Sequence, residues 1–267
     1  MANLEPLIQS IPVAPLKLAS LEGCRTLADQ VNNYLVSFRH ESPTNVGQAD
    51  SLQGYCADSY LLECECPRFG SGEGKGVLKE SVRGCDLFIM VDVTNYSLTY
   101  RVNGYENHMS PDNHYQDLKR IISAADGKAR RINVIMPFLY EGRQHKRSKR
   151  ESLDCALMLQ ELVDMGVSNI LTFDAHDPRV SNSIPLHGFD SFMPTYQFLK
   201  ALVNSVPDFV IDNDHLMIIS PDEGAMGRAV YFSNILGVDM GMFYKRRDYS
   251  TVVNGKNPLP MNFSAMM

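Results

Sequence analysis

Apolar and polar positions along the chain follow strand and helix periods in turn, most clearly between residues 132 and 178. Residues 132–138 form a short apolar run rich in β-branched side chains, which predicts a strand. Residues 151–165 place apolar side chains at helical spacing, and Gly166 follows where helices commonly end. A second apolar run, 169–173, predicts the next strand. This order predicts a βαβ unit with parallel strands.

The same patterns extend the prediction to the rest of the chain. We expect further helices at 21–38, 113–125, 195–203 and 225–236, and further strands at 60–66, 86–91, 216–219 and 238–244. Residues 1–20 contain three prolines and little periodicity, so we expect a loosely docked lead-in. Residues 95–113 are polar and rich in tyrosine, which is typical of a long surface excursion. The fold class is therefore α/β, with a domain boundary at residue 196.

Composition narrows the function classes. A chain of 267 residues is long enough for two modest α/β domains. The net charge of -6 leaves no overall basic footprint for nucleic acid. The six cysteines form no CxxC pair, which favours reduced, buried thiols in a cytosolic protein. Neither a signal-peptide pattern nor an apolar run of membrane-spanning length is present, so we expect a cytoplasmic protein without membrane contact.

Three polar clusters follow predicted strands: residues 141–147, residues 174–178 and residues 245–248. In an open α/β sheet, ligands bind beyond the carboxyl ends of the strands. Guanidinium groups bind phosphates, and a carboxylate with an imidazole suits a divalent cation that substrate phosphates also hold. Taken singly, an Asp-x-His turn is more often structural, and a Lys-Arg-Arg run is usually a solvated edge. Their order along the chain indicates magnesium-assisted transfer of a phosphorus-containing group.

The glycine-rich run 69–76 has two readings of equal weight. It lacks the order of a phosphate-binding P-loop, because Lys75 is followed by Gly76. The run is either a flexible hairpin tip or a loop that presents Phe69 for stacking and Glu73 for hydrogen bonding.

Five segments resemble the ribose-phosphate pyrophosphokinase family, also called phosphoribosyl pyrophosphate synthetases. They are the stretch 69–84 ending in ESVRG, the MPFLYEGRQ of 136–144, the FDAH of 173–176, the SPDEGA of 220–225 and the YKRR of 244–247. They occur in the order and at the spacing of the family between about residues 60 and 250.

The resemblance implies tandem phosphoribosyltransferase-like domains, 1–196 and 197–267, with mostly parallel sheets. It implies transfer of the diphosphoryl group of ATP to the C1 hydroxyl of ribose 5-phosphate, with Mg²⁺, in a homo-oligomer that shares its nucleotide site. The family pattern assigns roles to nine positions. ATP contacts fall on Phe69, Ser71, Glu73, Arg143 and Gln144, magnesium ligation on His176 and Asp222, and transition-state charge on Lys245 and Arg247.

The chain also departs from the family pattern. Ser71 replaces the usual asparagine, Ser148 replaces a common acidic residue, and the excursion 96–111 is longer than usual. The family's later pentose-phosphate loop is not found, so we expect an incomplete second domain that leaves Mg-ATP binding without ribose 5-phosphate binding. The codons of 261–267, read one base earlier, can encode a family-like segment, which suggests a frameshift. A non-catalytic regulatory or assembly partner, and a fragment that does not fold stably, remain as alternatives.

Overall fold

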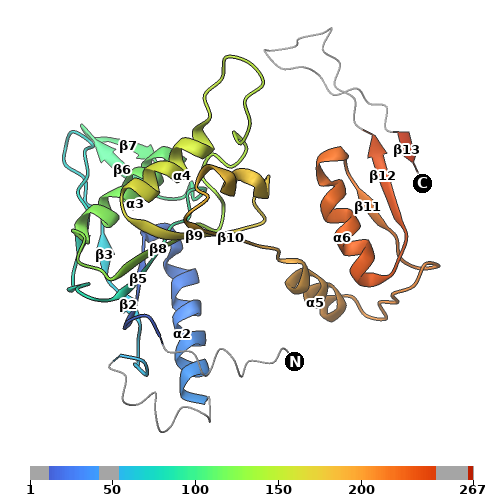
Figure 1. The fold of residues 1–267 in the computed structure, drawn as a ribbon, viewed down its shortest axis with the longest axis horizontal. Helices are drawn as coiled ribbons and strands as arrows, with labels where there is room; N and C mark the ends of the chain where they lie inside the picture. The colour runs from blue at the N-terminus through green and yellow to red at the C-terminus, as the bar shows by residue number, and fades with distance from the viewer. Residues whose placement is uncertain (1–11, 42–53, 245–263, 267) are drawn as a thin grey trace. The chain divides into compact units, whose positions relative to one another are not determined.

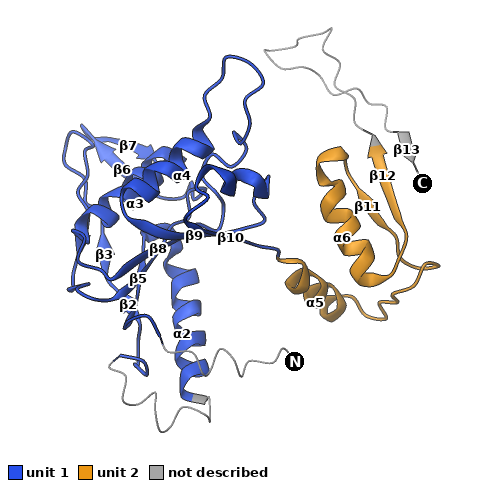
Figure 2. Cartoon of the chain, viewed as in Figure 1, with its two compact units in different colours: residues 1–193 blue, residues 194–267 orange. Residues whose placement is uncertain are grey.

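The structure is a computed structural model that describes residues 12–41, 54–244 and 264–266. The chain divides into two compact units, residues 1–193 and residues 194–267 (Figure 2). Within the described residues, the helices are too short or too polar to cross a membrane.

The first unit is built on a six-stranded sheet in the order β10-β9-β8-β5-β1-β2 (Figure 1). Its strands are β1 (Leu16–Ser20), β2 (Leu61–Leu62), β5 (Asp86–Met90), β8 (Arg131–Ile135), β9 (Val167–Phe173) and β10 (Gly188–Phe192). Every neighbouring pair is parallel. All carboxyl ends therefore lie on the same edge, and the strand order reverses between β1 and β5.

Helices cover both faces of this sheet. Side chains alternate between the two faces along each strand, so the apolar side chains on each face need a covering layer. They are α2 (Arg25–Glu41), α3 (Pro111–Ala124) and α4 (Asp154–Asp164), with short 3-10 turns η1 (Glu22–Cys24) and η3 (Pro178–Ser183). Leu18 of β1 packs with Ala28 of α2, whereas its neighbour Ala19 belongs to the larger core that contains Leu118 of α3 and Leu159 of α4. Successive strand residues point to opposite faces, so β1 joins both cores.

The first residues of α3 carry the sequence signals that are typical of a helix N-terminus. Ser110 and Asn113 form a capping box, in which Ser110 Oγ accepts from Asn113 N at 3.3 Å and Asn113 Oδ1 accepts from Ser110 N at 3.0 Å. Pro111 occupies the first turn, where its missing N–H has no cost. The buried face of the helix includes His114, Leu118 and Ile121. The predicted helix is confirmed, and it begins two residues earlier than expected.

Three expectations need correction. The described part of the 1–20 lead-in is not loosely docked, because residues 16–20 form β1 between two parallel neighbours. The single strand expected at 60–66 is divided. β2 joins the main sheet, while β3 (Cys64–Glu65) pairs antiparallel with β4 (Val77–Leu78). The excursion 95–113 contains an antiparallel hairpin of β6 (Thr99–Val102) and β7 (Tyr105–His108).

A local signal for this hairpin was present in the sequence. Asn103 and Gly104 join the strands with φ of 49° and 86°, the left-handed conformations that a two-residue hairpin turn of this type requires. An Asn-Gly pair between short runs of strand-forming residues predicts such a turn.

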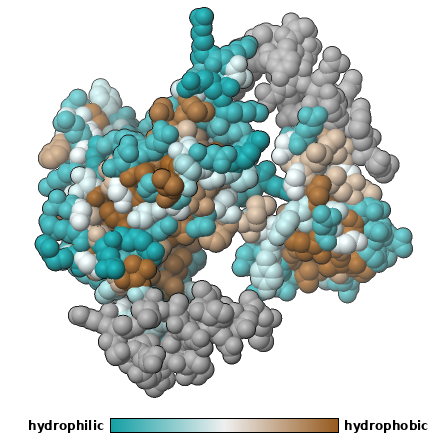
Figure 3. Space-filling view, viewed as in Figure 1, coloured by the Kyte–Doolittle hydropathy of each residue, from teal (hydrophilic) through white to brown (hydrophobic). Residues whose placement is uncertain are grey.

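The second unit contains a three-stranded sheet in the order β11-β12-β13. Its elements are α5 (Thr195–Ser205), β11 (Ile218–Ser220), η4 (Glu223–Ala225), α6 (Met226–Leu236), β12 (Met240–Tyr244) and β13 (Ser264–Met266). β11 and β12 are parallel, and β13 runs antiparallel to β12. Apolar side chains reach the surface of this unit, including Phe198 of α5 and Tyr231 and Ile235 of α6 (Figure 3).

Candidate functional site at the carboxyl edge of the sheet

The loop after β8 carries Arg143 on a tightly turned backbone. Glu141 adopts φ of 53°, and the N–H of Gly142 donates to the carbonyl of Leu139 at 3.0 Å. A Cβ at Gly142 would lie 3.0 Å from that carbonyl oxygen, so glycine suits the turn. The N–H of Gln144 then donates to the carbonyl of Glu141 at 2.8 Å. These bonds hold Arg143 on an exposed turn directly beyond the strand.

Tyr140 anchors this loop to helix α3. Its ring stacks on Tyr115 with centroids 4.5 Å apart, and its hydroxyl donates to Asp112 Oδ1 at 2.5 Å. Burial, followed by the bond to Asp112, raises the pKa of Tyr140, so the hydroxyl stays protonated as a donor. Tyr115 in turn donates to Glu161 of α4 at 2.6 Å. The base of the Arg143 loop is therefore fixed to two helices.

Arg143 lines a small cavity of about 120 Å³ between the loops that follow β5 and β8. Thr94 lines the other side, and its N–H and hydroxyl both donate to Asp92 Oδ1, at 2.9 and 2.7 Å. Sequence reasoning assigned no role to this second loop. The signal that could have found it is an Asp-Val-Thr run directly after a buried strand, at the edge where ligands bind.

Gln144 lies in the same loop, but its side-chain amide bonds to the backbone of that loop. Its Nε2 donates to the carbonyl of Ser152 at 2.7 Å. The expected nucleotide contact of Gln144 stays a prediction.

The loop after β9 brings a second polar group to the same edge. His176 is exposed, and its ring lies 5.0 Å from the ring of His145. His145 Nδ1 lies 3.4 Å from Asp177 Oδ2, and Asp177 also pairs with Arg179. Burial, with the cations nearby, lowers the pKa of His145, whereas the bonds to Arg179 lower the pKa of Asp177. The clusters 141–147 and 174–178 therefore meet, as their positions after neighbouring parallel strands predicted.

The side chains of His145, His176 and Asp177 could hold a magnesium ion only together with a bound substrate. Among the residues that the structure describes, no group of three His, Cys, Asp or Glu side chains is arranged to hold a metal ion. The Asp177 carboxylate already interacts with Arg179 and His145. His176 is therefore the exposed member of the His145–His176 pair that could bind a metal ion. Mg²⁺ keeps several waters and is commonly held by one or two carboxylates together with substrate phosphates, so His176 would need a carboxylate or phosphate partner. A phosphate-bridged magnesium ion is compatible with such a site.

Phe69, Ser71 and Glu73 lie at the tip of the β3–β4 hairpin. The N–H of Phe69 donates to the carbonyl of Glu73 at 2.7 Å, and Ser71 Oγ donates to Glu73 Oε2 at 2.8 Å. Phe69 is 53% exposed. The run is a hairpin tip, and it also presents the aromatic ring outward, so both readings describe part of it. Within the described residues, no hydrogen bond or ring contact joins this tip to the loop of Arg143.

The remaining predicted residues belong to the second unit or lie outside the description. Asp222 follows β11 and caps η4, where its Oδ1 accepts from Ala225 N at 3.1 Å. Its approach to His176 stays a prediction because the two residues belong to different units. Lys245 and Arg247 lie outside the described residues.

The thiols of the first unit give a test of its packing. Burial raises the pKa of Cys24 and Cys66 to about 12, and of Cys64 and Cys155 to about 11. Because the thiolate is the reactive form, these four stay protonated and unreactive at neutral pH. Cys56 is exposed, in contrast to the buried thiols expected from the sequence. We expect iodoacetamide to label Cys56 in the folded chain at pH 7–9, and to label Cys24, Cys64, Cys66 and Cys155 only after unfolding. Peptide mass spectrometry would measure this, and rapid labelling of Cys64 or Cys66 in the folded chain would contradict the packing.

Comparisons with known proteins agree on one group of relatives. Residues 16–166 match the family described as the N-terminal domain of ribose phosphate pyrophosphokinase. The ribose-phosphate pyrophosphokinase of Staphylococcus epidermidis is 27% identical over 201 residues, which cover 74% of this chain and 56% of that protein. The enzyme of the same name from Oceanobacillus iheyensis is 26% identical over 200 residues, with the same shares. The chain thus spans 56% of the length of these relatives.

The fold has a solved counterpart. The crystal structure of phosphoribosylpyrophosphate synthetase from Mycobacterium smegmatis aligns with a TM-score of 0.67 and 22% identity, covering 87% of this chain and 65% of that chain. This likeness confirms the predicted α/β fold with mostly parallel strands.

Proposed function

Since this chain belongs to the ribose phosphate pyrophosphokinase family, by the match of its N-terminal domain, we propose that it acts as a ribose-phosphate diphosphokinase. The proposed reaction transfers the diphosphoryl group of ATP to the C1 hydroxyl of ribose 5-phosphate. The C1 oxygen forms a bond to the β-phosphorus, the bond from that phosphorus to the α-phosphate oxygen breaks, and AMP leaves. The hydroxyl proton passes to solvent.

The observation that carries this proposal is the meeting of the Arg143 loop and the His145–His176 pair at the carboxyl edge of adjacent strands. An exposed guanidinium on a fixed loop binds phosphate oxygens through two parallel N–H donors. The exposed imidazole of His176, in the adjacent loop, can add one ligand to a magnesium ion that nucleotide phosphates also hold. A polyphosphate chain lying along this edge would meet both groups. Holding that chain in line is the main contribution a protein makes to phosphoryl transfer.

Other residues receive their roles from the family pattern. His176 and Asp222 would hold magnesium, which when bound neutralises charge on the phosphates. Lys245 and Arg247 would stabilise charge that develops on the transferring group. Phe69, Ser71 and Glu73 would reach the adenine bound by a neighbouring subunit. The outward position of Phe69 at a hairpin tip supports such a shared site, and with it a homo-oligomer.

Calorimetric titration of the chain with Mg-ATP tests the nucleotide site. We expect Arg143→Ala to weaken binding at least about tenfold, because a hydrogen bond to a charged group contributes roughly 1.5–3 kcal/mol. The matched control is Arg150→Ala, an exposed arginine that does not line the Arg143 cavity, with less than about a twofold change expected.

The outcomes separate the candidate functions. Formation of phosphoribosyl pyrophosphate from ATP and ribose 5-phosphate supports the diphosphokinase. ATP binding without diphosphoryl transfer favours a regulatory or assembly partner. Equal affinity in Arg143→Ala and the unsubstituted chain would remove Arg143 from the site.

A further inference from the structure

A second cavity of the first unit lies away from the Arg143 loop, at the point where the strand order reverses. Its volume is about 430 Å³, within the range of small-molecule sites. Leu21 and Glu22 follow β1 directly, and Ser97 and Leu98 lie in the segment after β5. In open α/β sheets, the crevice between two strands at such a reversal is a preferred ligand position. None of the nine residues assigned from the family pattern lines this cavity.

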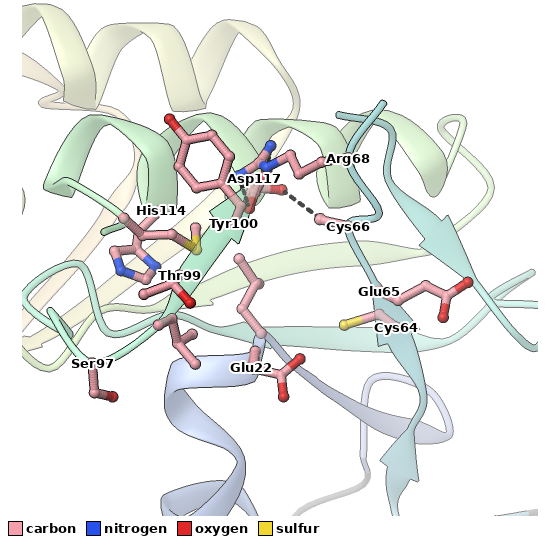
Figure 4. A pocket seen from close by; sticks show the side chains of 13 residues that line it. Glu22, Cys64, Glu65, Cys66, Arg68, Ser97, Thr99, Tyr100, His114 and Asp117 are labelled. Carbon is pink, nitrogen blue, oxygen red and sulfur yellow. Dashed lines mark hydrogen bonds and ion pairs between the residues drawn. The ribbon is translucent and has the colours of Figure 1, made fainter. Parts of the chain in front are cut away.

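The segment between β5 and α3 forms one wall. Figure 4 shows Thr99 and Tyr100 of β6 on the opposite side of the cavity from Cys64 and Cys66, and Met109 also lines it. Figure 4 shows Cys64 pointing toward the cavity, whereas Glu65 points away from it. Cys64 and Cys66 are two residues apart on an extended segment, so both reach the same side. The β6–β7 hairpin therefore adds a wall to a crevice that the sheet topology creates.

Charges at the cavity are already paired. Arg68 is the one lysine or arginine among the lining residues, all of which the structure describes. Its two terminal nitrogens donate to the carboxylate of Asp117 at 2.8 and 2.7 Å. Glu65 pairs with Lys79 at 2.5 Å, and Glu22 lies 3.4 Å from Arg25. The one cation among the lining residues is therefore already paired, and the lining carboxylates would repel a phosphate or a carboxylate, so the cavity suits an uncharged ligand.

The buried side chain of His114 has one ring nitrogen that can accept a hydrogen bond from a ligand. His114 is 2% exposed, and its Nε2 lies 2.6 Å from the carbonyl oxygen of Asn95. Because a carbonyl only accepts, Nε2 carries the hydrogen, and in the neutral ring Nδ1 is an acceptor. Among the described residues, no hydrogen bond uses Nδ1. His114 lines the cavity, which supplies the space for a donor.

The other lining residues indicate which kind of ligand surface would pack in the cavity. Leu21, Leu98 and Met109 are apolar, Tyr100 is aromatic, and the two cysteine sulfurs are protonated and polarizable. The Cys64 thiol already donates to the carbonyl of Ser20 at 3.2 Å. Sulfur and aromatic surfaces favour contact with flat rings.

We propose that this cavity binds an uncharged aromatic heterocycle with N–H donors, the chemistry of a nucleobase, with one N–H donated to His114 Nδ1. The ligand packs between the β6 wall and strand β3. Because Arg68 lies at the cavity and precedes Phe69, an occupied cavity contacts the base of the hairpin that carries the candidate adenine residues.

Adenine is the probe, measured by calorimetric titration of the chain. Thr99→Trp fills the mouth of the cavity from an exposed strand position. His114→Gln retains an N–H donor for the Asn95 carbonyl and removes the acceptor. The matched control is Tyr105→Trp, on the same hairpin, 77% exposed and not lining the cavity.

We expect one adenine per chain in the unsubstituted protein and in Tyr105→Trp, and at least tenfold weaker binding in Thr99→Trp and His114→Gln. Arg143→Ala should bind adenine unchanged, and orthophosphate should not compete. Absence of adenine binding, or equal affinity in Thr99→Trp, overturns the proposal. Loss of adenine binding in Arg143→Ala with full binding in Thr99→Trp also overturns it, since adenine would then occupy the candidate nucleotide site.

Discussion

Replacement of Asp117 by alanine is expected to lower the free energy of unfolding by about 3–5 kcal/mol, the cost of leaving a buried charge without its partner. The Asp117 side chain is 6% exposed and accepts from Arg68 and from Arg120, whose Nη1 lies 2.6 Å from Oδ1. Without the carboxylate, two guanidinium groups would face each other in a partly buried space, one of them 11% exposed. Urea unfolding followed by circular dichroism would measure the loss.

Two controls separate buried charge from loss of packing. Glu80→Ala removes the exposed partner of Lys17 and should cost no more than about 1 kcal/mol. The triple replacement Arg68→Met, Asp117→Leu and Arg120→Met removes all three charged groups together, and should recover most of the stability that Asp117→Ala loses, because replacing a buried charged cluster by apolar groups is often nearly neutral. A loss below about 1 kcal/mol in Asp117→Ala would show that water already solvates the pair.

Replacement of Lys245 or Arg247 by alanine is expected to lower kcat by about 10²–10³, the usual effect of removing one preorganised charge-stabilising group. The dissociation constant for Mg-ATP should change little. Interactions that strengthen in the transition state raise turnover, whereas equal binding of substrate and transition state does not. Steady-state rates of phosphoribosyl pyrophosphate formation by a form of the protein that also carries the pentose-phosphate loop, compared with calorimetric affinities, would separate the two effects.

Arg246→Ala is the matched control, since the same charge is removed from the adjacent position. It should leave kcat within about threefold, because the family pattern assigns no role to this position. Equal losses in binding and turnover for Lys245→Ala or Arg247→Ala would identify these residues as ordinary phosphate ligands.

Local patterns predicted the elements that carry strong signals. The helices α3 and α4 have apolar faces at helical spacing, and α3 also has a capping box, so neither needed tertiary information. Strand β1 was missed because its five residues follow two prolines and make no independent signal. Its conformation comes from pairing with β2 and β5 and from burial on both faces. Such contacts are not encoded locally.

The candidate site shows the same division. The prediction that clusters 141–147 and 174–178 lie together followed from parallel strands alone, because successive parallel strands end at one edge. The distance between the His145 and His176 rings, the pairing of Asp177 with Arg179 and the use of Gln144 to hold its own loop depend on packing. Side-chain partners chosen by neighbouring loops cannot be read from residue order.

By itself, the sequence determined the α/β class, the order of the main elements, the family and the edge at which polar side chains collect. The tertiary structure alone decided where the β6–β7 hairpin lies relative to the β1–β5 reversal, and that Arg68, Asp117 and His114 line a cavity with it. The reason is physical. Periodicity and capping act within a few residues, whereas a cavity is the space left between elements from distant parts of the chain, which only their packing defines.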